Sequence, residues 1–211
     1  MLIWFASGNP HKREELASIL SDAIRKNSGY VEMPAFELKI PADAGLDFDP
    51  DENGSSFLEN ALIKAGALYR LLEGRSDSHP IIADDSGICV DALGGRPGIH
   101  SARYGGKDLD AAGKNALLLE ELGDNPMRSA RFVCAMALYY GPDRFFVAQE
   151  CVEGELVKNA ECIRGKGGFG YDPIFYIPEL GRTSAELSAE EKNRLSHRGK
   201  AARAIAKMIN G

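Results

Sequence analysis

The sequence lacks the features that would place it at once among membrane, secreted or disulfide-rich proteins. No apolar run approaches the length of a membrane span, and the apolar start MLIWFA stops at Gly8 with no basic leader, so we expect neither a membrane segment nor a signal peptide. The four cysteines, Cys89, Cys134, Cys151 and Cys162, are widely spaced without a C-x-x-C pair, which favours free thiols. These absences predict a cytoplasmic protein.

An excess of positive charge is also missing. The 211 residues include 31 acidic and 25 basic side chains, a net charge of −6, which argues against a surface for nucleic acid polymers or anionic membranes. A few convergent cations still suffice to bind a small anion. The length, with 44% hydrophobic residues, favours a single folded domain over residues 1–211.

Hydrophobic periodicity predicts an α/β fold with a mixed sheet flanked by helices. Strands are expected, in chain order, at 2–6, 80–83, 131–140, 144–152 and 155–163, the third and fourth forming a hairpin. Helices are expected after Asn9, from Ser56, over 108–122 and from Ser188 onward, and Ser56/Glu59 and Ser188/Glu191 have capping-box spacing. Residues 34–55 are expected to form a loop with at most a short strand.

Polar segments interrupt this pattern at four places, the first being Ser7-Gly8-Asn9-Pro10-His11-Lys12 between a strand and a helix. The unpaired N–H groups of a helix start, together with Lys12, suit a phosphate. Taken alone, such residues are more often plain caps. The Walker pattern G-x-x-x-x-G-K-[ST] is absent from the chain.

The second segment is Asp84-Asp85-Ser86-Gly87. An acid pair at the end of a strand suits Mg²⁺ binding or the deprotonation of a water, whereas the tetrapeptide alone is equally typical of a turn. If the strand continues to Asp85, the two carboxylates point to opposite faces, so one acts and the other supports it. Asp51 or Glu52 would add a further metal ligand, although a helix dipole alone also favours acidic residues there.

The third segment, Gly165 to Gly170 (GKGGFG), matches G-x-G-x-x-G. A dinucleotide fingerprint must open a helix, and Pro173 opposes one, which disfavours a nicotinamide-dependent oxidoreductase. The glycines instead allow a flat ligand to approach, with Phe169 as stacking face and Asp172 as acceptor. The alternative is a glycine loop whose aromatic side chains pack inward.

The fourth segment holds Lys192 and Ser196-His197-Arg198. Lys192 and His197 are five residues apart, so a break near Ser196 is needed for both to face one pocket. Such cations usually lie on a solvated helix face. Beside an acid and a glycine loop they would instead offset a polyphosphate and donate to a carbonyl on a base.

Together, and in this order, these segments resemble the inosine triphosphate pyrophosphatase family, whose members hydrolyse non-standard purine nucleoside triphosphates such as ITP, dITP and XTP to the monophosphate and pyrophosphate. The resemblance spans nearly the whole chain and rests on five motifs: SGNPHK, FLENA, DDSGICVDALGGRPGIHSARYGG, GKGGFGYDPIFY and EEKNRLSHRGKA.

The resemblance implies an elongated α/β fold with a long mixed sheet, two lobes with a substrate cleft between them, a homodimer and a Mg²⁺ cofactor. It assigns proton acceptance and metal association to Asp85 and a substrate contact to Ser86. Glu52 is the candidate for a second metal contact, with Asp51 as the alternative, because the segment around 25–50 looks extended and leaves the choice between them open. The phosphate and sugar region would be lined by Ser7, Gly8, Asn9, Pro10, His11 and Lys12. The remaining nucleotide contacts would come from Phe169, Gly170, Tyr171, Asp172, Lys192, His197 and Arg198.

Base selectivity follows from hydrogen-bond polarity. Hypoxanthine and xanthine present a 6-oxo acceptor and an N1–H donor, whereas adenine presents the opposite pattern. Donors from His197 or Arg198, paired with the acceptor Asp172, would therefore favour the oxopurines. The alternative to an enzyme is a non-catalytic module that binds and senses purine nucleotides.

Overall fold

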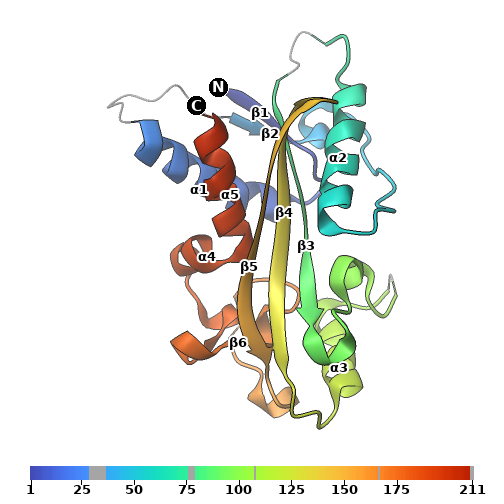
Figure 1. Ribbon diagram of the computed structural model, residues 1–211, viewed down its shortest axis with the longest axis vertical. Coiled ribbons are helices and arrows are strands. Elements are labelled where there is room, and N and C mark those ends of the chain that lie inside the picture. The colour runs from blue at the N-terminus through green and yellow to red at the C-terminus, as the bar shows by residue number, and fades with distance from the viewer. Residues whose placement is uncertain (29–36, 76–78, 107, 166, 210–211) are drawn as a thin grey trace. The chain divides into compact units, whose positions relative to one another are not determined.

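The computed structural model describes residues 1–28, 37–75, 79–106, 108–165 and 167–209, with the side chains of 10–11 and 26–28 outside that description (Figure 1). The described strands form an open seven-stranded mixed sheet in the order β2-β1-β3-β4-β5-β6-β7. Helices flank it, which confirms the predicted fold class. No helix in the described ranges is long and apolar enough to cross a membrane.

The chain divides into two compact units. Unit 1 comprises residues 1–85, 134–150 and 198–211, and unit 2 comprises residues 86–133 and 151–197. Short 3₁₀ helices connect the main elements of both units, at Pro41–Ala44, Asp91–Leu93, Gly98–Arg103, Ala160–Cys162, Asp172–Ile174, Pro178–Leu180 and Ser184–Glu186.

Unit 1 is built on the parallel strands β1 (Leu2–Phe5), β2 (Glu37–Lys39) and the start of β3 (Ile81–Val90). Alternate residues of β1 enter different cores, as the period of a strand requires. Ile3 and Phe5 pack with α1 (Pro10–Ser28) and α5 (His197–Ile209). Trp4 packs with α2 (Phe57–Leu71), and Figure 1 shows α2 on the side of these strands away from α1 and α5.

Unit 2 contains α3 (Ala111–Leu122), α4 (Ala189–Leu195) and the antiparallel strands β6 (Phe175–Ile177) and β7 (Arg182–Thr183). Its core joins Leu118 and Leu122 of α3 to Phe132, Phe175 and Ile177. The helix predicted over 108–122 is therefore confirmed, starting at its cap Asp110, whose side chain accepts from the Gly113 N–H.

The predicted hairpin is confirmed as β4 (Ser129–Gly141) and β5 (Arg144–Leu156), joined by Pro142 and Asp143. The separate strand expected at 155–163 is wrong. Glu155 and Leu156 instead end β5, where they pair with β6, and a 3₁₀ helix follows at Ala160–Cys162.

The strand predicted at 80–83 is longer than expected, because β3 runs without interruption from Ile81 to Val90 through the acid pair. The turn alternative for this segment is therefore wrong. Gly87 contributes to this extension, since a Cβ there would lie 2.4 Å from both the Gly98 carbonyl oxygen and the Ser101 hydroxyl. That hydroxyl accepts from the Ile88 N–H at 2.9 Å, so the backbone of β3 packs directly on the 3₁₀ helix Gly98–Arg103.

The two capping boxes turn out differently. Ser188 and Glu191 cap α4 reciprocally, as predicted. Ser56 caps α2 by accepting from the Glu59 N–H at 3.1 Å, and the Glu59 carboxylate accepts chiefly from the Ser55 N–H, at 2.6 Å. The main return bond of that box is shifted by one residue.

Candidate active site

Asp84 is a buried carboxylate on β3, 1% exposed, bound by two cations from other parts of unit 1. Lys12 of α1 approaches its two oxygens at 3.3 and 3.4 Å. Arg198, in the first turn of α5, donates from Nε at 3.2 Å. The Nη1 group of Arg198 donates to Glu15 at 2.7 Å, so the buried guanidinium joins two carboxylates.

The electrostatics make Asp84 a permanent anion. Burial by itself would raise the pKa of this carboxyl, but Lys12, Arg198 and Lys64 together lower it further than burial raises it, so the pKa lies well below its ordinary value. Asp84 therefore stays ionised over the whole physiological range and serves as an anchor for Lys12 and Arg198.

Asp85 has a different environment, because its side chain leaves the opposite face of the strand. Its Oδ2 accepts from Asn60 at 3.0 Å, and its Oδ1 lies 3.8 Å from the Lys64 ammonium. Burial raises the pKa of Asp85 above its ordinary value, with Glu52 adding to the rise and Lys64 and Asn60 opposing it. Of the adjacent acids, Asp85 is therefore the one suited to accept a proton from water.

Asn60 and Lys64 were missed by the sequence analysis. Both lie in α2, four residues apart and on one helix face, and they are 1% and 7% exposed. The available signal was a pair of polar residues on the same side as the buried apolar stripe that includes Ala61, Ala65 and Leu68. A polar pair in that position has to meet a polar partner, because unpaired burial is costly.

The residues around Lys64 fit a hard divalent cation. Glu52 binds the Lys64 ammonium at 2.8 Å while Asp85 lies on it at 3.8 Å, so two carboxylates face one positive charge. Mg²⁺ is commonly held by one or two carboxylates together with substrate phosphates. Within the described ranges no group of three or more His, Cys, Asp or Glu side chains is arranged to hold a metal by itself.

The loop between β1 and α1 is ordered by its own polar groups. The Asn9 N–H donates to the Ser7 hydroxyl at 3.1 Å, and the Lys12 N–H donates to the Asn9 side chain at 3.3 Å, so Asn9 caps the helix. Gly8 and Asn9 are exposed and Ser7 is half-buried. The side chains of Pro10 and His11 lie outside the described residues.

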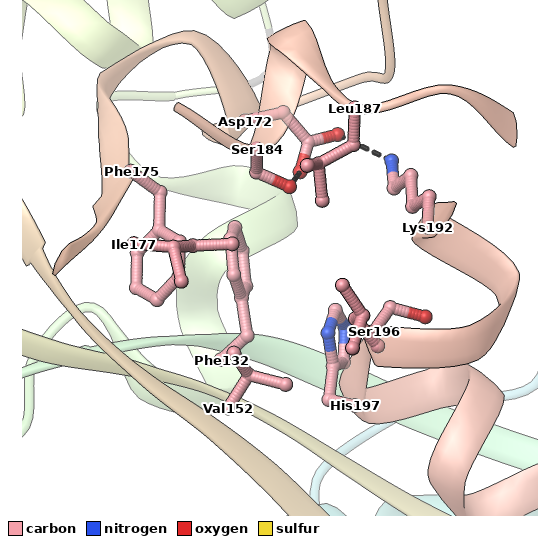
Figure 2. A pocket seen from close by; sticks show the side chains of 11 residues that line it. Phe132, Val152, Asp172, Phe175, Ile177, Ser184, Leu187, Lys192, Ser196 and His197 are labelled. Carbon is pink, nitrogen blue, oxygen red and sulfur yellow. Dashed lines mark hydrogen bonds and ion pairs between the residues drawn. The ribbon is translucent and has the colours of Figure 1, made fainter. Parts of the chain in front are cut away.

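A second group of predicted residues lines a pocket in unit 2 (Figure 2). At one edge of the pocket, Asp172 accepts from the Lys192 ammonium at 2.6 Å and from the Ser184 hydroxyl at 2.8 Å. Opposite them, the His197 imidazole stacks on the Phe132 ring, with centroids 4.9 Å apart. The cavity measures about 20 Å³, which is room for a single water.

The helix expected from Ser188 onward is divided near Ser196, which is the break that a shared pocket for Lys192 and His197 requires. α4 ends at Leu195, Ser196 is extended with φ −66° and ψ 156°, and α5 starts at His197. Lys192 and His197 consequently line the same pocket, as the sequence required for a common role.

Phe169 and Gly170, at the end of the glycine segment, are held by hydrogen bonds within unit 2. The Phe169 N–H donates to Asp172 at 2.8 Å, and Asn115 of α3 donates to the Gly170 carbonyl at 3.1 Å. Tyr171 is buried and its hydroxyl donates to the Ser101 carbonyl. Phe169 stays 45% exposed, with the Lys192 ammonium 4.7 Å from its ring centroid.

This arrangement agrees in part with each of the two interpretations of the glycine segment. A 3₁₀ helix at Asp172–Ile174 and then β6 follow it, as the predicted turn into a strand requires, and the helix that a dinucleotide site needs is not there. Tyr171 does pack inward, as the alternative held, whereas Phe169 is 45% exposed.

The predicted site residues thus fall into two sets. Unit 1 brings together Lys12, Glu52, Asp85 and Arg198, with Asn60 and Lys64 added. Unit 2 brings together Phe169, Gly170, Tyr171, Asp172, Lys192 and His197. The chain passes from unit 1 to unit 2 at Asp85–Ser86 and from unit 2 to unit 1 at His197–Arg198. At both places a predicted site residue of one unit is followed directly by one of the other unit. Ser86 itself is half-buried.

The fold and these two sets define an α/β protein with a buried acid pair on a central strand and a cation-lined pocket. The chain belongs to the Ham1 family, whose model matches residues 3–208. This membership confirms the family resemblance inferred from the five sequence motifs.

Individual relatives match most or all of the chain. The chain is 44% identical to the dITP/XTP pyrophosphatase of Treponema denticola over 214 residues, covering 100% of each. It is 50% identical to the dITP/XTP pyrophosphatase of Geobacillus kaustophilus, covering 83% of this chain and 87% of the relative. Among solved structures, the Staphylococcus aureus Ham1 protein has a TM-score of 0.82 at 36% identity, covering 100% of this chain and 99% of that one.

Proposed function

We propose that this protein hydrolyses the triphosphates of non-standard purine nucleosides, such as ITP, dITP and XTP, to the monophosphate and pyrophosphate. The observation that carries the proposal is Asp85, a mostly buried carboxylate whose pKa is raised and which contacts Lys64 and Asn60. The relatives that match the whole chain and are named dITP/XTP pyrophosphatases support the same reaction.

The chemistry proposed for unit 1 is proton acceptance beside a bound triphosphate. Asp85 takes a proton from a water whose oxygen bonds to the α-phosphorus, while the bond from that phosphorus to the bridging oxygen breaks and pyrophosphate leaves. Lys64 and Lys12 offset negative charge on the phosphates, and the backbone N–H groups at the start of α1 provide further donors. Asp84 acts indirectly, because it holds Lys12 in place.

Asp85 and Glu52 are the residues that would hold Mg²⁺. A bound Mg²⁺ supplies charge compensation for the phosphate oxygens and for the acid cluster. Lys64 would then exchange its present contact with Glu52 for contact with a phosphate oxygen, since an ammonium binds both kinds of oxygen as a point charge.

The chemistry proposed for unit 2 is recognition of the base. Phe169 is 45% exposed and offers part of its ring for a purine to stack on, so the base lies over the mouth of the pocket rather than inside its small cavity. Asp172 accepts from the N1–H of an oxopurine, and His197 or Lys192 donates to the 6-oxo group. Arg198 contributes through the anchor that it forms with Asp84 rather than by a free guanidinium edge.

The decisive experiment is pyrophosphate release from ITP and XTP by the wild type and by Asp85→Asn, with Asp22→Asn as control. Asp22 is an exposed aspartate paired with Arg25, so the same chemical change there should leave turnover intact. We expect Asp85→Asn to lose activity by about 10²–10⁴-fold, the range for a lost general base. Wild-type rates in the Asp85→Asn variant would refute the proposal.

A non-catalytic nucleotide sensor is the alternative. Such a protein would bind ITP tightly and release no pyrophosphate, with or without Mg²⁺, so the wild-type assay separates the two functions directly. We also propose that the enzyme acts in the cytoplasm, in keeping with four free cysteines, and as a homodimer. Cell fractionation tests the location.

A further inference from the structure

Unit 2 contains a second and larger cavity, which the proposed chemistry does not use. It measures about 500 Å³, and pockets that bind small organic ligands typically range from about 300 to 1,000 Å³. Its walls come from the end of β5, the segment that follows β5, and the strands β6 and β7. None of the predicted site residues lines it, so this cavity, called the second pocket below, needs an occupant of its own.

The second pocket lies on the opposite face of β6 from the pocket of Figure 2, called the base pocket below. Phe175 and Ile177 line the base pocket, whereas Tyr176 between them lines the second pocket, because side chains alternate along a strand. The short helix after β7 is divided in the same way, with Ser184 lining the base pocket and Glu186 lining the second pocket. The two pockets are therefore separate volumes within unit 2.

Three cations line the second pocket, namely Arg128, Lys158 and Arg164. Among the described residues, none of the three forms an ion pair with a carboxylate. The Nη1 group of Arg164 donates to the carbonyls of Glu161 and Ile163 at 2.6 and 2.9 Å, and its Nε and Nη2 groups have no hydrogen-bond acceptor in that part of the chain. Guanidinium and ammonium groups donate charge-assisted hydrogen bonds to phosphate oxygens. The lining therefore favours an anionic ligand.

Arg128 is fixed in place by backbone carbonyls. Its Nε and Nη2 groups donate to the carbonyls of Leu156 and Val157 at 2.9 and 2.6 Å. Burial lowers the pKa of this guanidinium, and Asp124 offsets only part of that effect. The positive charge at this wall of the second pocket is therefore incompletely compensated, and a bound anion would stabilise it.

The remaining lining suits an organic molecule better than a bare inorganic anion. Leu156 adds apolar surface and Tyr176 adds an aromatic ring. Glu155 is exposed and lines the same pocket, so its carboxylate is an acceptor for hydroxyl groups of a sugar. Glu186 is already engaged, because its carboxylate accepts from the Thr183 N–H at 2.8 Å. Cations, an acceptor and a ring together match the parts of a nucleotide.

We propose that the second pocket binds a nucleoside monophosphate. Its phosphate contacts the three cations, its ribose hydroxyls donate to Glu155, and its base packs against Tyr176. A phosphate monoester carries a charge of about −1.5 to −2 at neutral pH, which compensates cations that the protein leaves without carboxylate partners. This inference is independent of the proposed hydrolysis, because none of these residues belongs to the candidate active site.

The first test is equilibrium dialysis with radiolabelled AMP, whose adenine has the hydrogen-bond polarity that the base pocket disfavours. We expect saturable binding to the wild type, and a dissociation constant raised by about tenfold or more in Arg164→Ala and in Lys158→Ala, because each variant removes a charge-assisted hydrogen bond. Arg25→Ala, the same change on an exposed arginine of α1, should bind AMP as the wild type does. The urea midpoint of each variant checks its folding. No binding of AMP, or equal constants in all variants, would overturn the proposal.

The second test separates the second pocket from the base pocket. Lys192→Met changes the base pocket alone and should leave the dissociation constant of AMP unchanged. If Lys192→Met abolished AMP binding while Arg164→Ala kept it, AMP would lie in the base pocket and the proposal would be wrong.

The third test locates the ligand through a cysteine in the lining. Cys162 is half-buried and lines the second pocket, whereas Cys151 is exposed on β5 and does not line it. Saturating AMP should slow the alkylation of Cys162 by iodoacetamide and leave that of Cys151 unchanged, as mass spectrometry of the two peptides would show. Equal rates at Cys162 with and without AMP would contradict a ligand in this pocket.

Discussion

Replacing Asp84 by asparagine tests whether the buried ion pair is an anchor. Asparagine keeps the size of the side chain and removes its charge. The buried Arg198 guanidinium, 1% exposed, then keeps only Glu15 of its two carboxylates, and Lys12 loses its partner. Breaking one partner out of a buried pair costs about 3–5 kcal/mol, a large part of a total stability of about 5–15 kcal/mol.

The measurement is urea unfolding of the wild type, Asp84→Asn and Asp22→Asn. Asp22 pairs with Arg25 in solvent, both side chains being at least 60% exposed, so its removal should cost less than about 1 kcal/mol. A loss below about 1 kcal/mol for Asp84→Asn as well would refute the claim that this carboxylate is an ionised anchor.

The pH dependence of that difference provides a second check. The pKa of Asp84 is lowered in the folded protein, so its contribution is fully present above the unfolded value of about 3.9 and is lost as pH falls towards the folded value. The stability difference between wild type and Asp84→Asn should therefore be constant between pH 7 and 5 and shrink by about 1 kcal/mol by roughly pH 3. A difference that already shrinks near neutral pH would contradict the sign of the shift.

Three further predictions concern Asp85, Asn115 and Gly87. Burial raises the pKa of Asp85 and Lys64 opposes the rise, so the acid limb of the pH profile of kcat/KM should lie above the ordinary carboxyl pKa of about 3.9. In Lys64→Met this limb should move to higher pH. An unchanged limb would contradict the role of Lys64. Asn115→Leu removes the donor to the Gly170 carbonyl, so KM for ITP should rise about fivefold or more with kcat largely kept, as initial rates would show. Gly87→Ala places a Cβ 2.4 Å from two oxygens and should cost about 1–3 kcal/mol in urea unfolding, so an unchanged midpoint would argue against close packing there.

Short sequence patterns predicted the helices and the hairpin, because these elements depend on residues that are close together in the sequence. The apolar stripes of α1 and α2 and the turn at Pro142–Asp143 were sufficient to place two helices and a hairpin. The length of β3 was missed because the residues that support its acid pair are distant in sequence. Lys12 is 72 positions from Asp84 and Arg198 is 114 positions from it. The tetrapeptide Asp84 to Gly87 by itself contains only residues that favour turns, so it did not predict a continuous strand.

The candidate site was predictable as far as its motifs reach. The five motifs contain most residues of both sets, although Glu52 and Lys64 lie outside them. Lys192 and His197 line one pocket because the helix is divided at Ser196, a break that the sequence analysis gave only as a condition. Asn60 and Lys64 were missed because the interpretation of α2 counted its apolar positions only. Arg198 was expected to bind the nucleotide, and in the structure its guanidinium donates hydrogen bonds to Asp84 and Glu15.

The link from Asp84 to Arg198 has a consequence for biosynthesis. At about 5–20 residues per second, the ribosome needs roughly 6–23 s to add the 114 residues that separate the two. Throughout that interval the nascent chain carries an acid pair without its guanidinium counter-charge, so unit 1 cannot settle into its final form until α5 has emerged. Incompletely translated chains should accordingly be easy substrates for cellular proteases, a property that pulse labelling of stalled products would reveal.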